Sequence, residues 1–161
     1  MKFLTPTTLC ILAVSSQAAP VEYVQEIRVT APPEAVWDAL TMPELVKKWH
    51  MAPLQKIELK KGGRIIYARD GKVLISGTIT EIEPEVKLSH TFRFGAADHP
   101  DTGTDGDTVV TYTLRQDGKD TVLKLVHSGF TEKNQTYTNV TGGWPFILKK
   151  LKVALEPAPS P

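Results

Sequence analysis

Apolar and polar side chains alternate through most of the middle of the chain. Over residues 22–30, Ile27 and Val29 fall on one side while Glu26 and Arg28 fall on the other. A period of two residues with β-branched side chains is typical of a strand that buries one face. The same pattern predicts six further strands, at residues 55–59, 64–69, 73–83, 87–94, 108–115 and 121–128.

Glycine-containing pairs mark the connections between these strands. Residues 62–63, 70–71 and 117–118 are Gly-Gly or Asp-Gly pairs, which favour tight hairpin turns. Strands joined by such short connections pair antiparallel, so we expect an antiparallel sheet. Gly77 interrupts the long strand 73–83 and indicates a β-bulge or a close approach of two backbones.

Helical spacing occurs at two places. After the first strand, Pro33 suits the first turn of one short helix and Thr41 is a candidate N-cap for a second. From Gly143 onward, apolar side chains recur every three or four residues, as they do on the buried face of a helix. That face carries Trp144, Ile147, Leu148, Leu151 and Leu155.

The predicted order is therefore one strand, two short helices, six strands and one long helix. This order is typical of an α+β fold with an antiparallel sheet. Such a sheet has one apolar face, and the terminal helix is the element long enough to cover it.

Composition narrows the class of protein. The chain has 161 residues, of which 41% are hydrophobic and 23% charged, values ordinary for one globular domain. Lys and Arg number 19, and Asp and Glu number 18. Because the numbers of basic and acidic residues are nearly equal, we do not expect nucleic acid or an anionic membrane surface as a partner.

Residues 1–18 differ from the rest of the chain. Lys2 carries their only charge, residues 9–14 are apolar, and Ala18 ends a run of small and polar residues. This arrangement is typical of a secretory signal peptide, and its apolar run is too short to span a bilayer. We therefore expect a periplasmic or secreted protein without stable membrane insertion after cleavage. Cleavage would remove Cys10, the only cysteine, so we predict no disulfide and no thiolate chemistry.

A family resemblance rests on motifs that follow one another along the chain. They are Ala31–Thr41, Glu44–Trp49, Gly62–Arg64, Gly77–Pro84, His127–Phe130 and Gly143–Pro145, with Leu148 and Leu151. Together they resemble the START-like, or SRPBCC, superfamily over residues 21–156. Within it they are similar to the branch of the C-terminal domain of activators of the heat-shock-90 chaperone ATPase. The domain boundaries are then 1–18 for the signal peptide, 19–156 for the START-like domain and 157–161 for a Pro-rich tail.

The resemblance implies a helix-grip fold, in which a curved antiparallel sheet wraps around a long C-terminal helix. It also implies that two short helices close one end and that a hydrophobic cavity lies between sheet and helix. Family members bind apolar small molecules there, some catalyse cyclisation there, and others associate with chaperones. No catalytic motif of the branch can be transferred, and no cofactor is expected. Strand alternation and the family architecture predict that the cavity is lined by Trp49, Tyr67, Ile75, Ile79, Leu88, His90, Phe92, Tyr112, His127, Trp144 and Leu148.

Two histidines are weak candidates for chemistry. His90 and His127 fall on mainly apolar strand faces, where each is either a cavity acid or base or a hydrogen-bonded core residue. An enzyme would pair one of them with Tyr67 or Tyr112. His50 follows Trp49 near the expected cavity mouth, where it either contacts a ligand or is exposed.

The segment 95–107 is rich in Asp and Gly. Asp101, Asp105 and Asp107 resemble part of a calcium loop, but Gly103 stands where an oxygen ligand is needed. We interpret the segment as a solvated hairpin loop and predict no metal site.

Three arginines, Arg64, Arg69 and Arg93, lie on predicted strands and could face either the cavity or solvent. An arginine that faces an apolar cavity needs a carboxylate from the protein or from a ligand. Alternation turns Arg93 away from Phe92 and Phe94, towards solvent.

The leading hypothesis is a non-enzymatic protein that binds an apolar small molecule. One alternative is a protein-partner module like the chaperone activators. The other is a cyclase- or hydrolase-type enzyme that uses His90 or His127.

Overall fold

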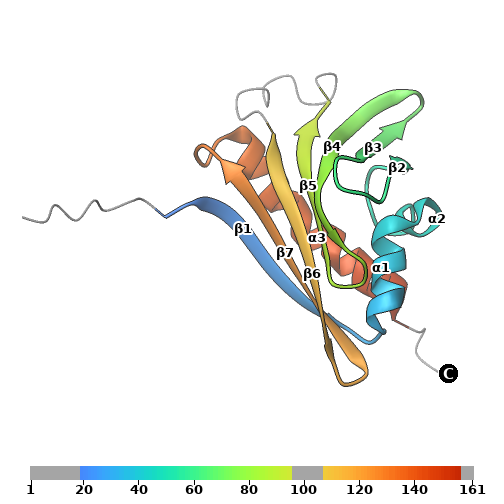
Figure 1. Cartoon of the computed structure of the whole chain (residues 1–161). Helices are drawn as coiled ribbons and strands as arrows, with labels where there is room; N and C mark the ends of the chain where they lie inside the picture. The colour runs from blue at the N-terminus through green and yellow to red at the C-terminus, as the bar shows by residue number, and fades with distance from the viewer. Residues whose placement is uncertain (1–18, 96–106, 157–161) are drawn as a thin grey trace, which may run out of the picture.

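In the computed structural model, which describes residues 19–95 and 107–156, seven strands form one curved antiparallel sheet (Figure 1). The elements are β1 (Val21–Val29), α1 (Pro33–Thr41), α2 (Pro43–Val46), β2 (Leu54–Ile57), β3 (Arg64–Arg69), β4 (Lys72–Glu83), β5 (Lys87–Phe94), β6 (Thr108–Asp117), β7 (Asp120–Phe130) and α3 (Gln135–Leu155). The strand order across the sheet is β1-β7-β6-β5-β4-β3-β2. This confirms the predicted order of elements and the α+β class.

The sheet joins distant parts of the chain at one edge. Strands β2 to β7 each pair with their neighbours in sequence, whereas β1 pairs with β7, with Val29 opposite Thr121. Where β1 ends, the Thr121 hydroxyl donates to the Ala31 carbonyl oxygen at 2.7 Å, across 90 positions of sequence. The first strand is therefore held by the last one.

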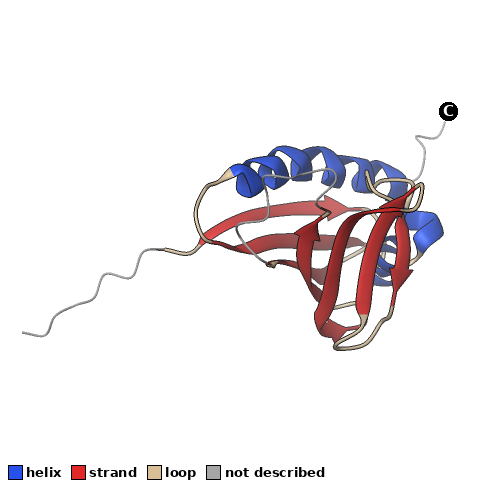
Figure 2. Cartoon of the chain, turned by 90° about the horizontal axis from the view of Figure 1, so that it is seen from above, coloured by secondary structure: helices blue, strands red, loops and turns tan. Residues whose placement is uncertain are grey.

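Helix α3 lies across one face of the sheet (Figure 2). Val140, Trp144, Leu148 and Leu151 are buried along one side of this helix, at the spacing of a helical face. They pack in a single core with side chains from the sheet and from α1. This is the helix-grip arrangement. Within the described residues, no helix combines the length and the apolar character that a membrane span requires.

Two helix boundaries differ from those predicted. Helix α3 begins at Gln135, not at Gly143, and the Asn134 side chain caps it by accepting from the Tyr137 N–H at 3.0 Å. Its first two turns are mostly polar, which weakened the apolar period. Thr41 is not the N-cap of α2, because its hydroxyl donates to the Trp37 carbonyl oxygen at 2.8 Å inside α1.

The close approach predicted at Gly77 is confirmed. A Cβ atom added at Gly77 would lie 1.8 Å from the carbonyl oxygen of Thr91 on the adjacent strand β5. Only a residue without a side chain fits at this position of β4, so the glycine permits the tight pairing of β4 with β5.

The variants Gly77→Ala and Gly142→Ala should move stability in opposite directions. The first places a methyl group against the backbone of β5 and should lower the free energy of unfolding by about 1–3 kcal/mol. The second adds a methyl group in α3 that meets nothing within 4 Å, and should raise it by about 0.5–1 kcal/mol. Urea denaturation measures both, and equal effects would contradict the close approach.

Candidate functional site

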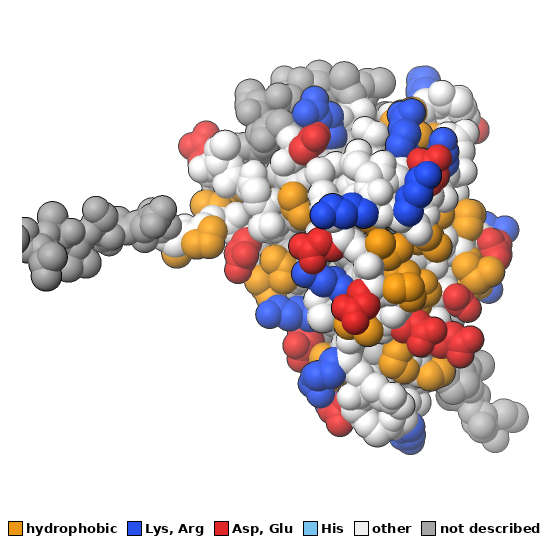
Figure 3. All heavy atoms as spheres, viewed as in Figure 1, with side chains coloured by type: hydrophobic (Ala, Val, Ile, Leu, Met, Phe, Trp, Pro, Cys, Tyr) orange, Lys and Arg blue, Asp and Glu red, His pale blue; other side chains and the backbone are white. Residues whose placement is uncertain are grey.

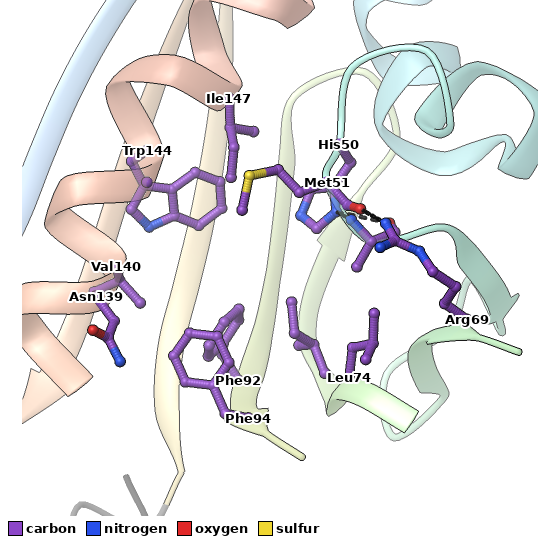
Figure 4. Close-up of a pocket in the computed structure, with 13 residues that line it drawn as sticks. His50, Met51, Arg69, Leu74, Phe92, Phe94, Asn139, Val140, Trp144 and Ile147 are labelled. Atoms are coloured by element: carbon purple, nitrogen blue, oxygen red, sulfur yellow. Dashed lines mark hydrogen bonds between the residues drawn. The ribbon is translucent and has the colours of Figure 1, made fainter. Parts of the chain in front are cut away.

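A pocket of about 280 Å³ opens between α3, the β3–β5 side of the sheet and the segment that follows α2 (Figure 4). It is lined by His50, Met51, Ala52, Arg69, Leu74, Ile75, Phe92, Phe94, Asn139, Val140, Gly143, Trp144 and Ile147.

Local structure sets the positions of these side chains. Val140, Trp144 and Ile147 follow one another at helical spacing and so share one face of α3. Phe92 and Phe94 lie two residues apart on β5, which turns both rings to the same face of the sheet. The two rings meet edge to face, with centroids 4.9 Å apart.

The mouth of the pocket is formed by the segment after α2. Figure 4 shows the Met51 side chain between Trp144 and His50. Met51 is 54% exposed and also lines the pocket, so it lies where the pocket meets solvent. The Arg69 guanidinium donates to the Met51 carbonyl oxygen and so ties this segment to the end of β3.

A chain of hydrogen bonds fixes the Trp144 wall of the pocket. The Trp144 indole N–H donates to Nδ1 of His127 at 3.0 Å. Nδ1 is then the unprotonated nitrogen, so the Nε2–H of His127 donates to the Thr108 hydroxyl at 2.7 Å. That hydroxyl donates in turn to the Phe92 carbonyl oxygen at 3.1 Å. The chain links α3 to β7, β6 and β5.

His127 therefore has both ring nitrogens engaged. Burial, with a smaller contribution from His90, lowers its pKa to about 3, so the ring is neutral at neutral pH. In this geometry His127 positions Trp144 and offers no free nitrogen to a substrate.

His90 is buried differently. Its Nδ1 lies 2.7 Å from the Thr91 carbonyl oxygen, to which Nδ1–H donates. Its Nε2 is buried and has no hydrogen-bond partner among the described residues. Burial lowers the pKa of His90 to about 4, which leaves Nε2 as an acceptor lone pair.

His50 is a pocket residue, and the alternative of an exposed side chain is wrong. The ring is buried and stacks on Tyr67, with centroids 4.5 Å apart. Its Nδ1 lies 2.8 Å from the Ala52 carbonyl oxygen. Burial lowers the pKa of His50 to about 4, so it too is neutral at neutral pH. The adjacent Trp49 is a core residue whose indole N–H donates to the Ala39 carbonyl oxygen at 2.8 Å.

Three of the side chains predicted to line a cavity, Ile75, Phe92 and Trp144, line this pocket. The other eight are buried in the core and are not among its lining residues: Trp49, Tyr67, Ile79, Leu88, His90, Tyr112, His127 and Leu148. Alternation identifies the face on which a side chain lies, but side chains on that face fill most of the space beneath α3. The ligand-binding role of all eleven stays a prediction.

Sequence reasoning missed several lining residues for identifiable reasons. Asn139, Val140 and Gly143 belong to the part of α3 around and before its predicted start, and the spacing from Val140 to Trp144 and Ile147 was a usable signal. Met51 and Ala52 lie outside regular structure, where no periodic pattern could indicate them.

The acidic segment gives no support for a metal site in what the structure describes. Asp101 and Asp105 lie outside the described residues. Asp107 accepts from the Nε–H of Arg93 at 2.7 Å, on the solvent side as alternation predicted for that arginine. No group of three or more potential metal ligands occurs within residues 19–95 and 107–156. The predicted signal peptide and the Pro-rich tail also lie outside the described residues.

Comparison with known proteins gives a family. The family model described as activator of Hsp90 ATPase homolog 1-like protein matches residues 30–156. A search of curated proteins gave no match.

Solved structures agree with this match. Protein MLL2253 from Mesorhizobium loti is 31% identical, with a TM-score of 0.71 over 84% of this chain and 96% of that one. CalU16 from Micromonospora echinospora is 27% identical, with a TM-score of 0.66 over 84% of this chain and 76% of that one. PFC0360w, an HSP90 activator from Plasmodium falciparum, is 21% identical, with a TM-score of 0.65 over 83% of this chain and 95% of that one, a likeness of fold.

Replacing the two core histidines should have unequal costs. His127→Leu leaves the buried Trp144 N–H without an acceptor and should lower the free energy of unfolding by about 2–4 kcal/mol. His90→Leu removes one hydrogen bond, to the Thr91 carbonyl oxygen, together with a nitrogen that has no partner among the described residues, and should cost about 1 kcal/mol. Urea denaturation at pH 7.5 compares them, and equal losses would contradict the positioning role of His127.

Stability should fall as the pH drops from about 6.5 towards 4. His50, His90 and His127 have folded-state pKa values of about 4, 4 and 3, below the 6.5 of an unperturbed histidine. The unfolded chain therefore binds more protons in this window, and each group lowers stability by up to about 1.4 kcal/mol per pH unit. Urea denaturation at several pH values should report an uptake approaching three protons on unfolding near pH 5. A His90→Phe variant should take up one proton fewer.

Proposed function

The chain belongs to the activator of Hsp90 ATPase homolog 1-like family, within the SRPBCC superfamily, and from that premise we propose that it binds an apolar small molecule in the pocket beside α3. The observation that carries this proposal is the pocket itself. Its walls are mainly aliphatic and aromatic, and the Trp144 wall is held in place by His127. A preformed apolar cleft with few polar groups is typical of small-molecule sites.

A protein-partner role is the second candidate, because the family takes its name from chaperone activators. A large exposed apolar patch would mark such an interface. On the face in Figure 3, apolar side chains are interspersed with Lys, Arg, Asp and Glu. On α3, Phe146 and Val153 are 56% and 68% exposed, which makes the outer side of this helix the surface to test.

We also propose that the protein acts outside the cytoplasm, after removal of residues 1–18. The support is the charge, apolar run and small residues of that segment. Intact mass spectrometry of the protein from its natural host should find a chain that begins at Ala19. A full-length chain in the cytoplasm would contradict the proposal and would favour the partner role.

Native mass spectrometry of the same material tests the binding function. A discrete excess mass that disappears on denaturation would support it. A protein of bare chain mass that also fails to bind 1-octanol, a neutral apolar probe, would contradict it.

The variant Gly143→Met should block the pocket, and Gly142→Met is its matched control. Gly143 lines the pocket, and an added Cβ meets only the Cδ1 of Ile147, at 3.9 Å. Gly142 is exposed and an added Cβ meets nothing. Affinity for 1-octanol, measured by calorimetry, should fall by about tenfold or more in the first variant, which corresponds to about 1.4 kcal/mol. It should stay within about twofold in the second. Equal affinities in the two variants would place the probe elsewhere.

A further inference from the structure

Among the described residues, one charged side chain lines the pocket. That side chain is Arg69, no aspartate or glutamate that the structure describes lines the pocket, and His50 is neutral at neutral pH because it is buried. The remaining lining residues are apolar, except for Asn139. A site of this composition has a positive potential at one point and apolar walls elsewhere.

We propose that the pocket binds a monocarboxylate with an apolar body, and that Arg69 binds the carboxylate. The proposal rests on the proposed function, because it names the chemical class of the ligand.

Arg69 has no protein carboxylate of its own in the part of the chain that the structure describes. Arg28 and Arg93 pair with Asp117 and Asp107 at 2.5 and 2.7 Å, whereas no described carboxylate lies within 4.0 Å of Arg69. An arginine beside an apolar cavity is best matched by a carboxylate that accepts two of its N–H groups. The ligand is the group that can supply it.

The position of Arg69 suits a ligand that enters with its apolar end first. Arg69 and Met51 are both exposed and both line the pocket, so they mark its mouth, while Trp144 and Phe92 are buried on its inner walls. One Arg69 N–H binds the Met51 carbonyl oxygen, which holds the guanidinium near the mouth (Figure 4). A guanidinium has five N–H donors, so others stay available to a carboxylate.

The volume limits the size of the apolar body. At about 30 Å³ for each non-hydrogen atom, the value for water in the liquid, a pocket of about 280 Å³ holds about ten such atoms. Octanoate has this size, and so has 3-phenylpropanoate, whose ring would meet the Phe92 and Phe94 rings. The shared chemistry is a carboxylate on an apolar body of medium length, from either an alkyl or an aryl source.

The experiment compares octanoate with 1-octanol, which has the same chain and no charge. Calorimetry on the purified protein at pH 7.5 and low salt gives both affinities. We expect octanoate to bind about tenfold more tightly than 1-octanol, and salt to weaken octanoate binding alone. A parallel titration with 3-phenylpropanoate reports whether alkyl or aryl carboxylates bind more tightly.

The test variant is Arg69→Gln, which removes the charge but keeps an amide N–H for the Met51 carbonyl oxygen. Arg64→Gln is the control, because Arg64 lies on the same strand, is exposed and does not line the pocket. Arg69→Gln should abolish the preference, so that the affinities for octanoate and 1-octanol lie within about twofold of each other. Arg64→Gln should leave the preference intact.

The outcomes separate this proposal from the function on which it rests. If the natural chain binds both probes equally, the carboxylate proposal is wrong and the apolar binding function stands. If Arg69→Gln keeps the preference, the assignment of the carboxylate to Arg69 is wrong. If neither probe binds, both the proposal and the function are wrong.

Discussion

The position of α3 on the sheet and the shape of the pocket both depend on the hydrogen bond from the Trp144 indole to His127. It continues through Thr108 to the backbone of Phe92, so one helix and three strands share a single polar chain inside an apolar core. Each polar atom in that chain has a partner, which offsets the cost of burying it. Because the indole is also a pocket wall, the helix cannot shift on the sheet without deforming the site.

The interior of the protein is polar in places but carries no charge from its histidines at neutral pH. His50, His90 and His127 are all buried, and burial keeps each of them neutral. Among the described residues that line the pocket, charge is therefore confined to the mouth, where Arg69 lies. The attraction between two charges falls with their distance, so Arg69 can select by charge only on the part of a ligand that stays near the opening.

The strands could be predicted from the sequence because each buries one face. Apolar side chains therefore recur at every second residue, as at Ile27 and Val29 and in the later strands. The sequence was a poor guide to the first turns of α3, where only Thr136 and Val140 are buried before Trp144. The sequence also could not show which side chains on the apolar face of the sheet line the pocket. Ile79 and Phe92 lie on the same apolar face, but only Phe92 lines it. From the sequence we inferred that an arginine facing the cavity needs a carboxylate partner. Which arginine lines the pocket could not be inferred, because it depends on how β3 packs against the segment after α2.

The position of β1 at the sheet edge bears on how the chain is made. Strands β2 to β6 can pair with their sequence neighbours as each leaves the ribosome. Strand β1 emerges before them, yet its partner β7 follows after the whole meander, and the Ala31–Thr121 contact spans 90 positions. During that interval its backbone N–H and C=O groups and its apolar side chains are open to other chains. In the nascent protein, β1 is thus synthesised before the other strands of this sheet but is the last of them to pair.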